Sequence, residues 1–262
     1  MSRLWSSPRY RVHLAADALM ACEVHGHRGR RHAVRKACFP FVAGQRAAAM
    51  QSLREWMAAA RRTTMGHALQ EWVLGTSEVR YLLLPWTPDL ADKNLRQAFA
   101  FALFEQRFQQ DPGLYTVRFA KAAYGRAQLV AFVAQPLLSE IEEHARVSQV
   151  RLASVAPSLA TVWDRFRPLL EKEHGVVCLV DGDRQIVVHH AQGRIGEVLL
   201  RPFDVRRREA APSMQASDVT LRFFSSIPLR YVSPEAALSL MDGEGFLATQ
   251  DAAYAFALCG VF

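Results

Sequence analysis

The chain has 262 residues, 50% of them hydrophobic, and a formal net charge of +7, which is enough apolar material for one large core or two smaller ones. No apolar run approaches the roughly 18 to 20 residues that a membrane-spanning helix needs, and the first 15 residues hold three Arg without the apolar stretch of a secretory signal. The four Cys are scattered and form no CxxC pair, so neither a zinc site nor a disulfide framework is expected.

The first third of the chain predicts three strands followed by a helix. Short apolar runs separated by turn-forming residues indicate the strands. An Ala-rich segment at 46–62, with apolar residues at three- and four-residue spacing, indicates the helix. The three strands cover residues 11–15, 19–24 and 33–39.

The middle of the chain predicts further strands and helices. Two strands between 68 and 86 are separated by Gly75-Thr76-Ser77, and a helix at 92–108 begins at Asp92, a suitable N-cap residue. The apolar residues of this helix predict a buried stripe, made of Leu95, Phe99, Leu103 and Phe104. A hairpin, a helix that opens at Pro136, a strand and a helix that Pro168 ends or kinks complete this part, at residues 116–134, 136–147, 149–154 and 159–170.

The last third begins with a second three-strand meander from Gly175. Beyond the meander we expect a polar loop, two strands, a helix that starts at Ser233-Pro234 and a short closing helix. The loop covers 206–216, the strands 218–226 and 227–233, and the closing helix 251–262.

The chain repeats one pattern in its two parts. Arg11 to Phe41 and Val176 to Phe203 each contain an apolar run that ends at an Asp, two more apolar runs and a final Pro-Phe. Asp17 precedes Pro40 by 23 residues and Asp181 precedes Pro202 by 21, so the two Asp are expected at corresponding turns. Such a long period indicates duplicated halves, with boundaries at 1–174 and 175–262.

The repeated meander resembles the actin/Hsp70/hexokinase superfold, which is RNase H-like. The mixture of strands and helices fits an α/β fold with mixed sheets flanked by helices in each half. If the fold is actin-like, the shorter second half is truncated. The resemblance implies that the two hairpins would approach the phosphates of ATP, so Asp17, Asp181 and Gly182 are the candidate nucleotide-binding residues.

The two turns depart from the phosphate-binding pattern, in which small residues let backbone N–H groups close on phosphate oxygens. The first turn reads Asp17-Ala18-Leu19-Met20, without Gly or a hydroxyl, and the second keeps Gly182 but adds the carboxylate of Asp183. Turn formation alone also explains these Asp residues. We therefore expect no cofactor and no catalysis, with Mg-ATP as the alternative cofactor.

Other catalytic and metal-binding motifs are missing from the sequence. No P-loop, GxSxG, HExxH or GxGxxG occurs, and the adjacent His189 and His190 would point to opposite faces of a strand.

Positive charge is concentrated near the start of the chain. Residues 1–67 contain 12 Arg or Lys against 3 Asp or Glu. The excess fits a solvated strand face, an acidic protein or lipid surface, or nucleic acid, and the last is disfavoured because no nucleic-acid-binding motif accompanies it. The candidate partner-binding residues of this basic patch are Arg28, Arg30, Arg31, Arg35 and Lys36.

A narrower resemblance lies in residues 79–108 and at the C-terminal end. Leu84-Pro85, Leu95-Arg96-Gln97-Ala98 and Phe104-Glu105-Gln106 resemble motifs of the PilM-type proteins of type IV pili and the cytoplasmic part of GspL-type proteins of type II secretion. Tyr254 to Phe262 resembles the closing helix of PilM-type proteins. The nucleotide loops of PilM and the membrane span of GspL have no counterpart here.

This resemblance implies a non-catalytic scaffold of a pilus or secretion assembly. Such a protein is cytoplasmic and is recruited to the inner-membrane face, where it docks onto a bitopic partner and makes peripheral contact with the membrane. Two alternatives stay open: a divergent ATPase or kinase of the same superfold, and a basic nucleic-acid-binding protein. Trp86, Phe101 and Phe108 fit either core packing or an exposed docking surface.

Overall fold

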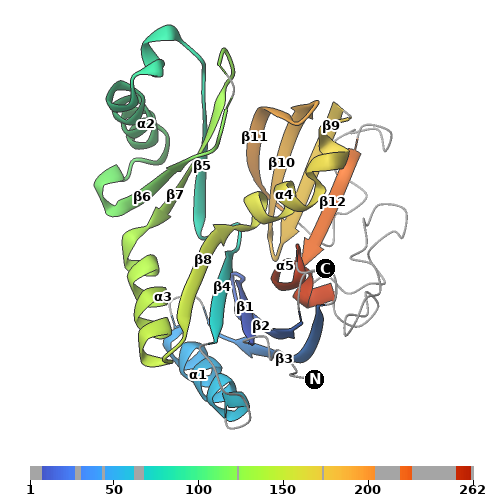
Figure 1. The fold of residues 1–262 in the computed structure, drawn as a ribbon. Coiled ribbons are helices and arrows are strands. Elements are labelled where there is room, and N and C mark those ends of the chain that lie inside the picture. Colours follow the sequence, from blue (N-terminus) through green and yellow to red (C-terminus); the bar gives the residue numbers. More distant parts are fainter. Residues whose placement is uncertain are drawn as a thin grey trace, which may run out of the picture.

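The computed structural model describes residues 8–26, 31–42, 45–61, 68–122, 124–172, 174–203, 219–225 and 252–260. Its strands form three sheets (Figure 1). The first sheet has the order β3-β2-β1-β4-β8, with β3 at His32–Pro40, β2 at Ala18–His25, β1 at Arg9–Leu14, β4 at Leu69–Leu74 and β8 at Arg151–Pro157. The second has the order β11-β10-β9-β12, with β11 at Arg194–Pro202, β10 at Arg184–Ala191, β9 at His174–Asp181 and β12 at Val219–Ser225. The third has the order β5-β7-β6, with β5 at Val79–Leu84, β7 at Gln128–Ala134 and β6 at Tyr115–Phe119.

The first two sheets repeat one topology, as the sequence pattern predicts. In each sheet three antiparallel strands form a meander, and a fourth strand pairs in parallel with the first strand of that meander. The register also shifts at matching places, between Glu23 and Val24 in one copy and between His189 and His190 in the other. A shared irregularity of this kind supports duplicated halves, because bulges are specific features of a strand pair.

The strand register corrects the expected correspondence between Asp17 and Asp181. The first hairpin pairs Leu14 with Leu19 and closes with a bond from the Ala15 N–H to the Ala18 carbonyl, whereas the second pairs Asp181 directly with Arg184. Asp17 therefore corresponds to Asp183, and Asp181 corresponds to Ala15. Six residues separate β2 from β3, but only two separate β10 from β11. The distance from the hairpin turn to the Pro is therefore shorter in the second copy, and similar spacings to the Pro select Asp181 in place of Asp183.

The small third sheet and a helix form an arm, drawn at the upper left of Figure 1. The helix, α2 (Lys93–Phe108), begins as predicted: the Asp92 carboxylate accepts bonds from two backbone N–H groups of the first turn. The predicted buried stripe is wrong at Leu95 and Phe99, which are 56% and 40% exposed. The helix packs instead through Ala100 and Phe104, because its apolar residues lie on two faces and only one meets the sheet.

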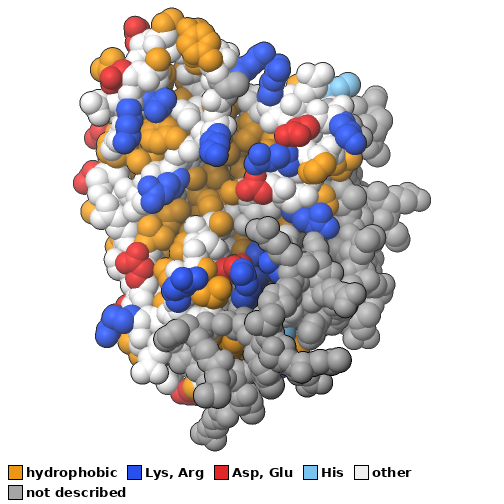
Figure 2. Space-filling view, in the orientation of Figure 1, with side chains coloured by type: hydrophobic (Ala, Val, Ile, Leu, Met, Phe, Trp, Pro, Cys, Tyr) orange, Lys and Arg blue, Asp and Glu red, His pale blue; other side chains and the backbone are white. Residues whose placement is uncertain are grey.

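Aromatic residues of the arm divide between its core and its surface. Phe101 and Phe108 are partly buried against the arm's own core. Trp86 is 37% exposed and lies edge-on to Tyr124, with ring centroids 5.0 Å apart. Figure 2 shows apolar side chains gathered in the middle of this face of the molecule, with Lys and Arg around them.

Two helices join the first two sheets across a common core. Helix α4 (Ser158–Leu170) follows β8 directly and packs on the second sheet, where Trp163 lies edge-on to His190. The closing helix α5 (Ala255–Leu258), preceded by the 3-10 turn Ala252–Tyr254, packs back on the first sheet. One core cluster includes residues of both sheets. The predicted boundary at 174/175 falls after the first residue of β9, four residues beyond the end of α4, and stays a prediction.

The remaining elements mostly follow the sequence-based expectations. Helix α1 (Ala47–Arg61) packs against β2 and β3, and α3 (Gln135–Val147) connects β7 to β8. Pro168 lies inside α4, which ends two residues later. The short closing helix is confirmed at Ala255–Leu258. The predicted loop at 206–216, strand at 227–233 and helix from Ser233 lie outside the described residues.

Candidate functional site at the junction of the repeated hairpins

The turns of the two repeated hairpins meet, as the resemblance to the superfold implies. Gly182 has a positive φ of 61°, a conformation that favours glycine. A Cβ atom placed on Gly182 would lie 3.9 Å from the Cβ of Ala16, at the turn of the first hairpin. The structure thus brings the second turn against the first and defines a junction between the halves.

The carboxylate of Asp181 is buried at this junction. Its side chain is 1% exposed, and Oδ2 accepts a hydrogen bond of 3.0 Å from the backbone N–H of Thr76, in the turn between β4 and β5. The Nε2 atom of His13, on β1, lies 3.4 Å from the same oxygen, and the His13 side chain is fully buried. A second-half carboxylate is therefore hydrogen-bonded to one first-half group and lies within ion-pair distance of another.

Gly75 makes room for this carboxylate. A Cβ atom at position 75 would lie 2.4 Å from Oδ2 of Asp181 and 2.5 Å from the carbonyl oxygen of Leu14. Both distances are far shorter than a van der Waals contact. The break between the two predicted strands thus has a packing reason: only glycine allows β4, β1 and Asp181 to approach this closely.

The other predicted nucleotide-site residue, Asp17, has a different environment. It is exposed at the first turn, and its carbonyl accepts a bond from the Phe41 N–H just as the Asp183 carbonyl does from Phe203. Burial raises the pKa of the Cys38 thiol, and the charge of Asp17 adds to that effect. Nucleotide binding by Asp17, Asp181 and Gly182 stays a prediction, and a buried carboxylate at the junction disfavours a phosphate there by like-charge repulsion.

The basic patch is only partly described. Arg35 is engaged within the molecule: its guanidinium carbon lies 4.5 Å from the Trp56 ring centroid, and it donates to the Trp56 carbonyl and pairs with Glu23. Arg35 therefore has less freedom to bind a partner than the sequence alone indicates. Arg31 and Lys36 are half-buried, and Arg28 and Arg30 lie outside the described residues.

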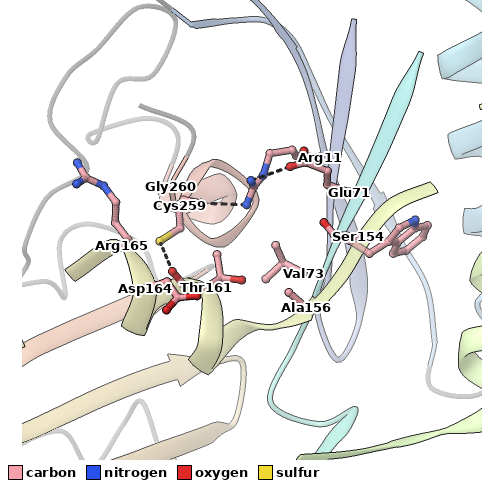
Figure 3. Close-up of a pocket in the computed structure, with 11 residues that line it drawn as sticks. Arg11, Glu71, Val73, Ser154, Ala156, Thr161, Asp164, Arg165, Cys259 and Gly260 are labelled. Atoms are coloured by element: carbon pink, nitrogen blue, oxygen red, sulfur yellow. Dashed lines mark hydrogen bonds and ion pairs between the residues drawn. The ribbon is translucent and has the colours of Figure 1, made fainter. Parts of the chain in front are cut away.

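A cavity of about 450 Å³ lies beside the closing helix, lined by residues of β1, β4, β8, α4 and the end of the chain (Figure 3). Arg11 lies in the wall of this cavity. Its guanidinium donates to the carbonyls of Ala257 and Cys259 at 2.7 and 2.9 Å and pairs with Glu71 at 2.9 Å. Burial lowers the pKa of Arg11, and Glu71 opposes that shift. Burial raises the pKa of Cys259 to about 12, so its thiol stays protonated and is a poor nucleophile at neutral pH.

The junction uses residues that the sequence analysis missed. His13, Gly75 and Thr76 hold Asp181, and none of them was a candidate. A polar His inside the apolar run of the first strand was the available signal. Within the described ranges, no group of three or more His, Cys, Asp or Glu could hold a metal ion.

Two sheets of like topology, joined by crossing helices and meeting at repeated hairpins, define an actin-like fold. The comparisons confirm this fold and the expected likeness to GspL- and PilM-type structures. The chain matches the cytoplasmic domain of EpsL, an inner membrane component of the type II secretion system of Vibrio cholerae, with a TM-score of 0.59 and 12% identity over 98% of this chain and 97% of that one.

Two further solved structures share the fold. A chain of the PilM–PilN type IV pilus biogenesis complex matches with a TM-score of 0.53 and 17% identity, over 76% of this chain and 63% of that chain. A Bacteroides thetaiotaomicron protein with an actin-like ATPase fold and unknown function matches at 0.51, with 8% identity over 77% and 73% of the two chains. No protein-family model and no curated protein sequence matches. None of the helices in the described residues has the length and apolar character to cross a bilayer.

Proposed function

We propose that this protein is a non-catalytic, actin-like scaffold of a type II secretion or type IV pilus assembly. The observation that carries the proposal is the end-to-end match to the EpsL cytoplasmic domain, which covers 98% of one chain and 97% of the other. A match over nearly the whole of both chains is more specific than a likeness to the actin-like superfold in general. In this role the protein acts on the cytoplasmic face of the inner membrane.

The site geometry supports a role without nucleotide. The junction of the hairpins holds the buried carboxylate of Asp181, and the first turn has Leu19 and Met20 buried directly after it. Neither feature favours a bound phosphate. Apolar side chains on the surface framed by Lys and Arg (Figure 2) fit contact with another protein, because large apolar patches commonly mark interaction sites.

The partner in this proposal is a bitopic inner-membrane protein with a short cytoplasmic tail. The direct test is a titration of fluorescein-labelled tail peptides, taken from the bitopic secretion and pilus proteins of the same genome, into the purified protein. We expect saturable binding to one of them and none to its scrambled sequence. Absence of binding to every tail, by a protein that is folded, would contradict the proposal.

A divergent ATPase is the second candidate, favoured by the retention of Gly182 in its left-handed turn. It differs from the scaffold in one measurable property. A nucleotide-binding protein is stabilised by Mg-ATP, by about 2.7 kcal/mol at a hundredfold excess over Kd.

The basic patch gives a prediction about the membrane or an acidic partner. Replacing Arg28 and Arg30 by Glu should weaken binding to vesicles with 30% anionic lipid by roughly thirtyfold or more, since each basic residue near an anionic surface contributes about 1 kcal/mol. Co-sedimentation measures the effect. Arg118→Glu with Arg151→Glu is the charge-matched control at two exposed positions. Equal loss in both double variants would show that net charge, and not this patch, governs binding.

A further inference from the structure

Three groups of the first half converge on one point at the junction. The Thr76 N–H lies 3.0 Å from Oδ2 of Asp181, His13 Nε2 lies 3.4 Å from it, and Gly75 leaves the space that this oxygen fills. His13 is fully buried, and neither of its ring nitrogens has a hydrogen-bond partner among the described residues, so its relation to Asp181 is one of ion-pair distance only. A buried backbone N–H and a buried imidazole both need an acceptor, since an unpaired buried polar group is costly.

We propose that His13, Gly75 and Thr76 form a carboxylate-binding site between the halves, and that Asp181 is its permanent internal ligand. The site has the parts of an anion site: a main-chain donor, a side chain able to carry positive charge, and a glycine at the point of closest approach. Its ligand comes from the other half of the same chain. The carboxylate therefore links the halves without a diffusible ligand.

This linkage has a consequence for the motion of the halves. In a protein whose halves close around a ligand, closure depends on the ligand concentration. Here the ligand is covalently part of β9, so its effective concentration is fixed and closure is constitutive. The inference rests on the junction geometry and stands whether or not the protein binds a secretion or pilus partner.

Removing the internal ligand tests the site. Asp181→Ala should leave the Thr76 N–H without its acceptor and His13 without a nearby carboxylate, and should lower the melting temperature. Sodium formate, a small carboxylate, should then raise the melting temperature of Asp181→Ala by roughly 3 °C more than sodium chloride at equal ionic strength. Wild type should show no such difference, because its site is filled.

Asp183→Ala is the matched control. Asp183 lies two residues further on in the same hairpin and is exposed, so its removal should produce no formate-specific shift. An equal formate effect in all three proteins, or none in Asp181→Ala, would overturn the proposal. Rescue by phosphate but not by formate would overturn the assignment of the site to carboxylates.

A second measurement covers the case in which Asp181→Ala does not fold. Asp181→Asn keeps an oxygen acceptor for the Thr76 N–H and removes the charge that faces His13. Amide hydrogen exchange should leave Thr76 protected in wild type and in Asp181→Asn, and formate should change neither. Exchange at Thr76 in wild type as fast as in an exposed turn would overturn the proposal, because the N–H would then have no buried acceptor.

Discussion

Replacing Gly75 by alanine should destabilise the protein by roughly 2–4 kcal/mol, although it adds only one methyl group. The added Cβ would lie 2.4 Å from the Asp181 carboxylate and 2.5 Å from the Leu14 carbonyl, so β1, β4 and the second hairpin would have to separate. Urea denaturation of wild type and variant measures the change in the free energy of unfolding.

The control for this prediction is Gly196→Ala on β11. A Cβ atom there would meet its nearest neighbour, the His189 carbonyl, at an ordinary 3.7 Å. That variant should be neutral or stabilised by up to about 1 kcal/mol, because alanine reduces the entropy of the unfolded chain. In the Asp181→Ala background, Gly75→Ala should cost less stability than it does in wild type, but it should still be destabilising, since the Leu14 carbonyl still blocks the methyl group. A Gly75→Ala protein as stable as wild type would contradict the close approach at the junction.

Replacing Arg11 by methionine should cost roughly 2–4 kcal/mol and should release the closing helix. The Arg11 side chain is 12% exposed; its guanidinium donates to two carbonyls at the end of α5 and pairs with Glu71. Its loss removes the donor to both carbonyls, while Glu71 keeps its ion pair with Arg9. Methionine keeps most of the volume, which separates the lost bonds from a lost contact. Urea denaturation measures the cost.

Thiol labelling reports on the closing helix itself. Cys259 is fully buried beside α5, so its maleimide labelling, read by peptide mass spectrometry, should become at least tenfold faster in Arg11→Met. Arg9→Met is the control, because Arg9 is 37% exposed, makes a single ion pair with Glu71 and should cost no more than about 1 kcal/mol. If both variants label Cys259 at the wild-type rate, Arg11 does not hold α5 in place.

The sequence predicts the repeated meanders because their signal is local. Alternating apolar residues and turn formers specify each hairpin, and the Asp92 cap specifies the start of α2. The exposure of Leu95 and Phe99 was not predictable in this way. Their spacing fits a buried stripe, and which of the two apolar faces of α2 meets the arm depends on the packing of β5 and β7.

The sequence predicts where the candidate site lies but not which residues contact one another there. The two hairpin turns meet, as the superfold resemblance implies, but the correspondence of Asp17 with Asp181 was wrong by two residues because the connections after β2 and β10 differ in length. The partners of Asp181 come from β1 and from the turn after β4, 168 and 105 residues away in the chain. Contacts of this sequence separation leave no periodic pattern, and the break at Gly75 reads as an ordinary turn.

The most direct test of a scaffold without nucleotide is the melting temperature of the wild-type protein in rising concentrations of Mg-ATP. The internal carboxylate and the crowded first turn predict no shift up to millimolar nucleotide, beyond that given by magnesium chloride and sodium chloride at equal ionic strength. A shift that grows with the logarithm of the nucleotide concentration, reaching about 2.7 kcal/mol of stabilisation at a hundred times Kd, would contradict the account. It would make the divergent ATPase the better description of this protein.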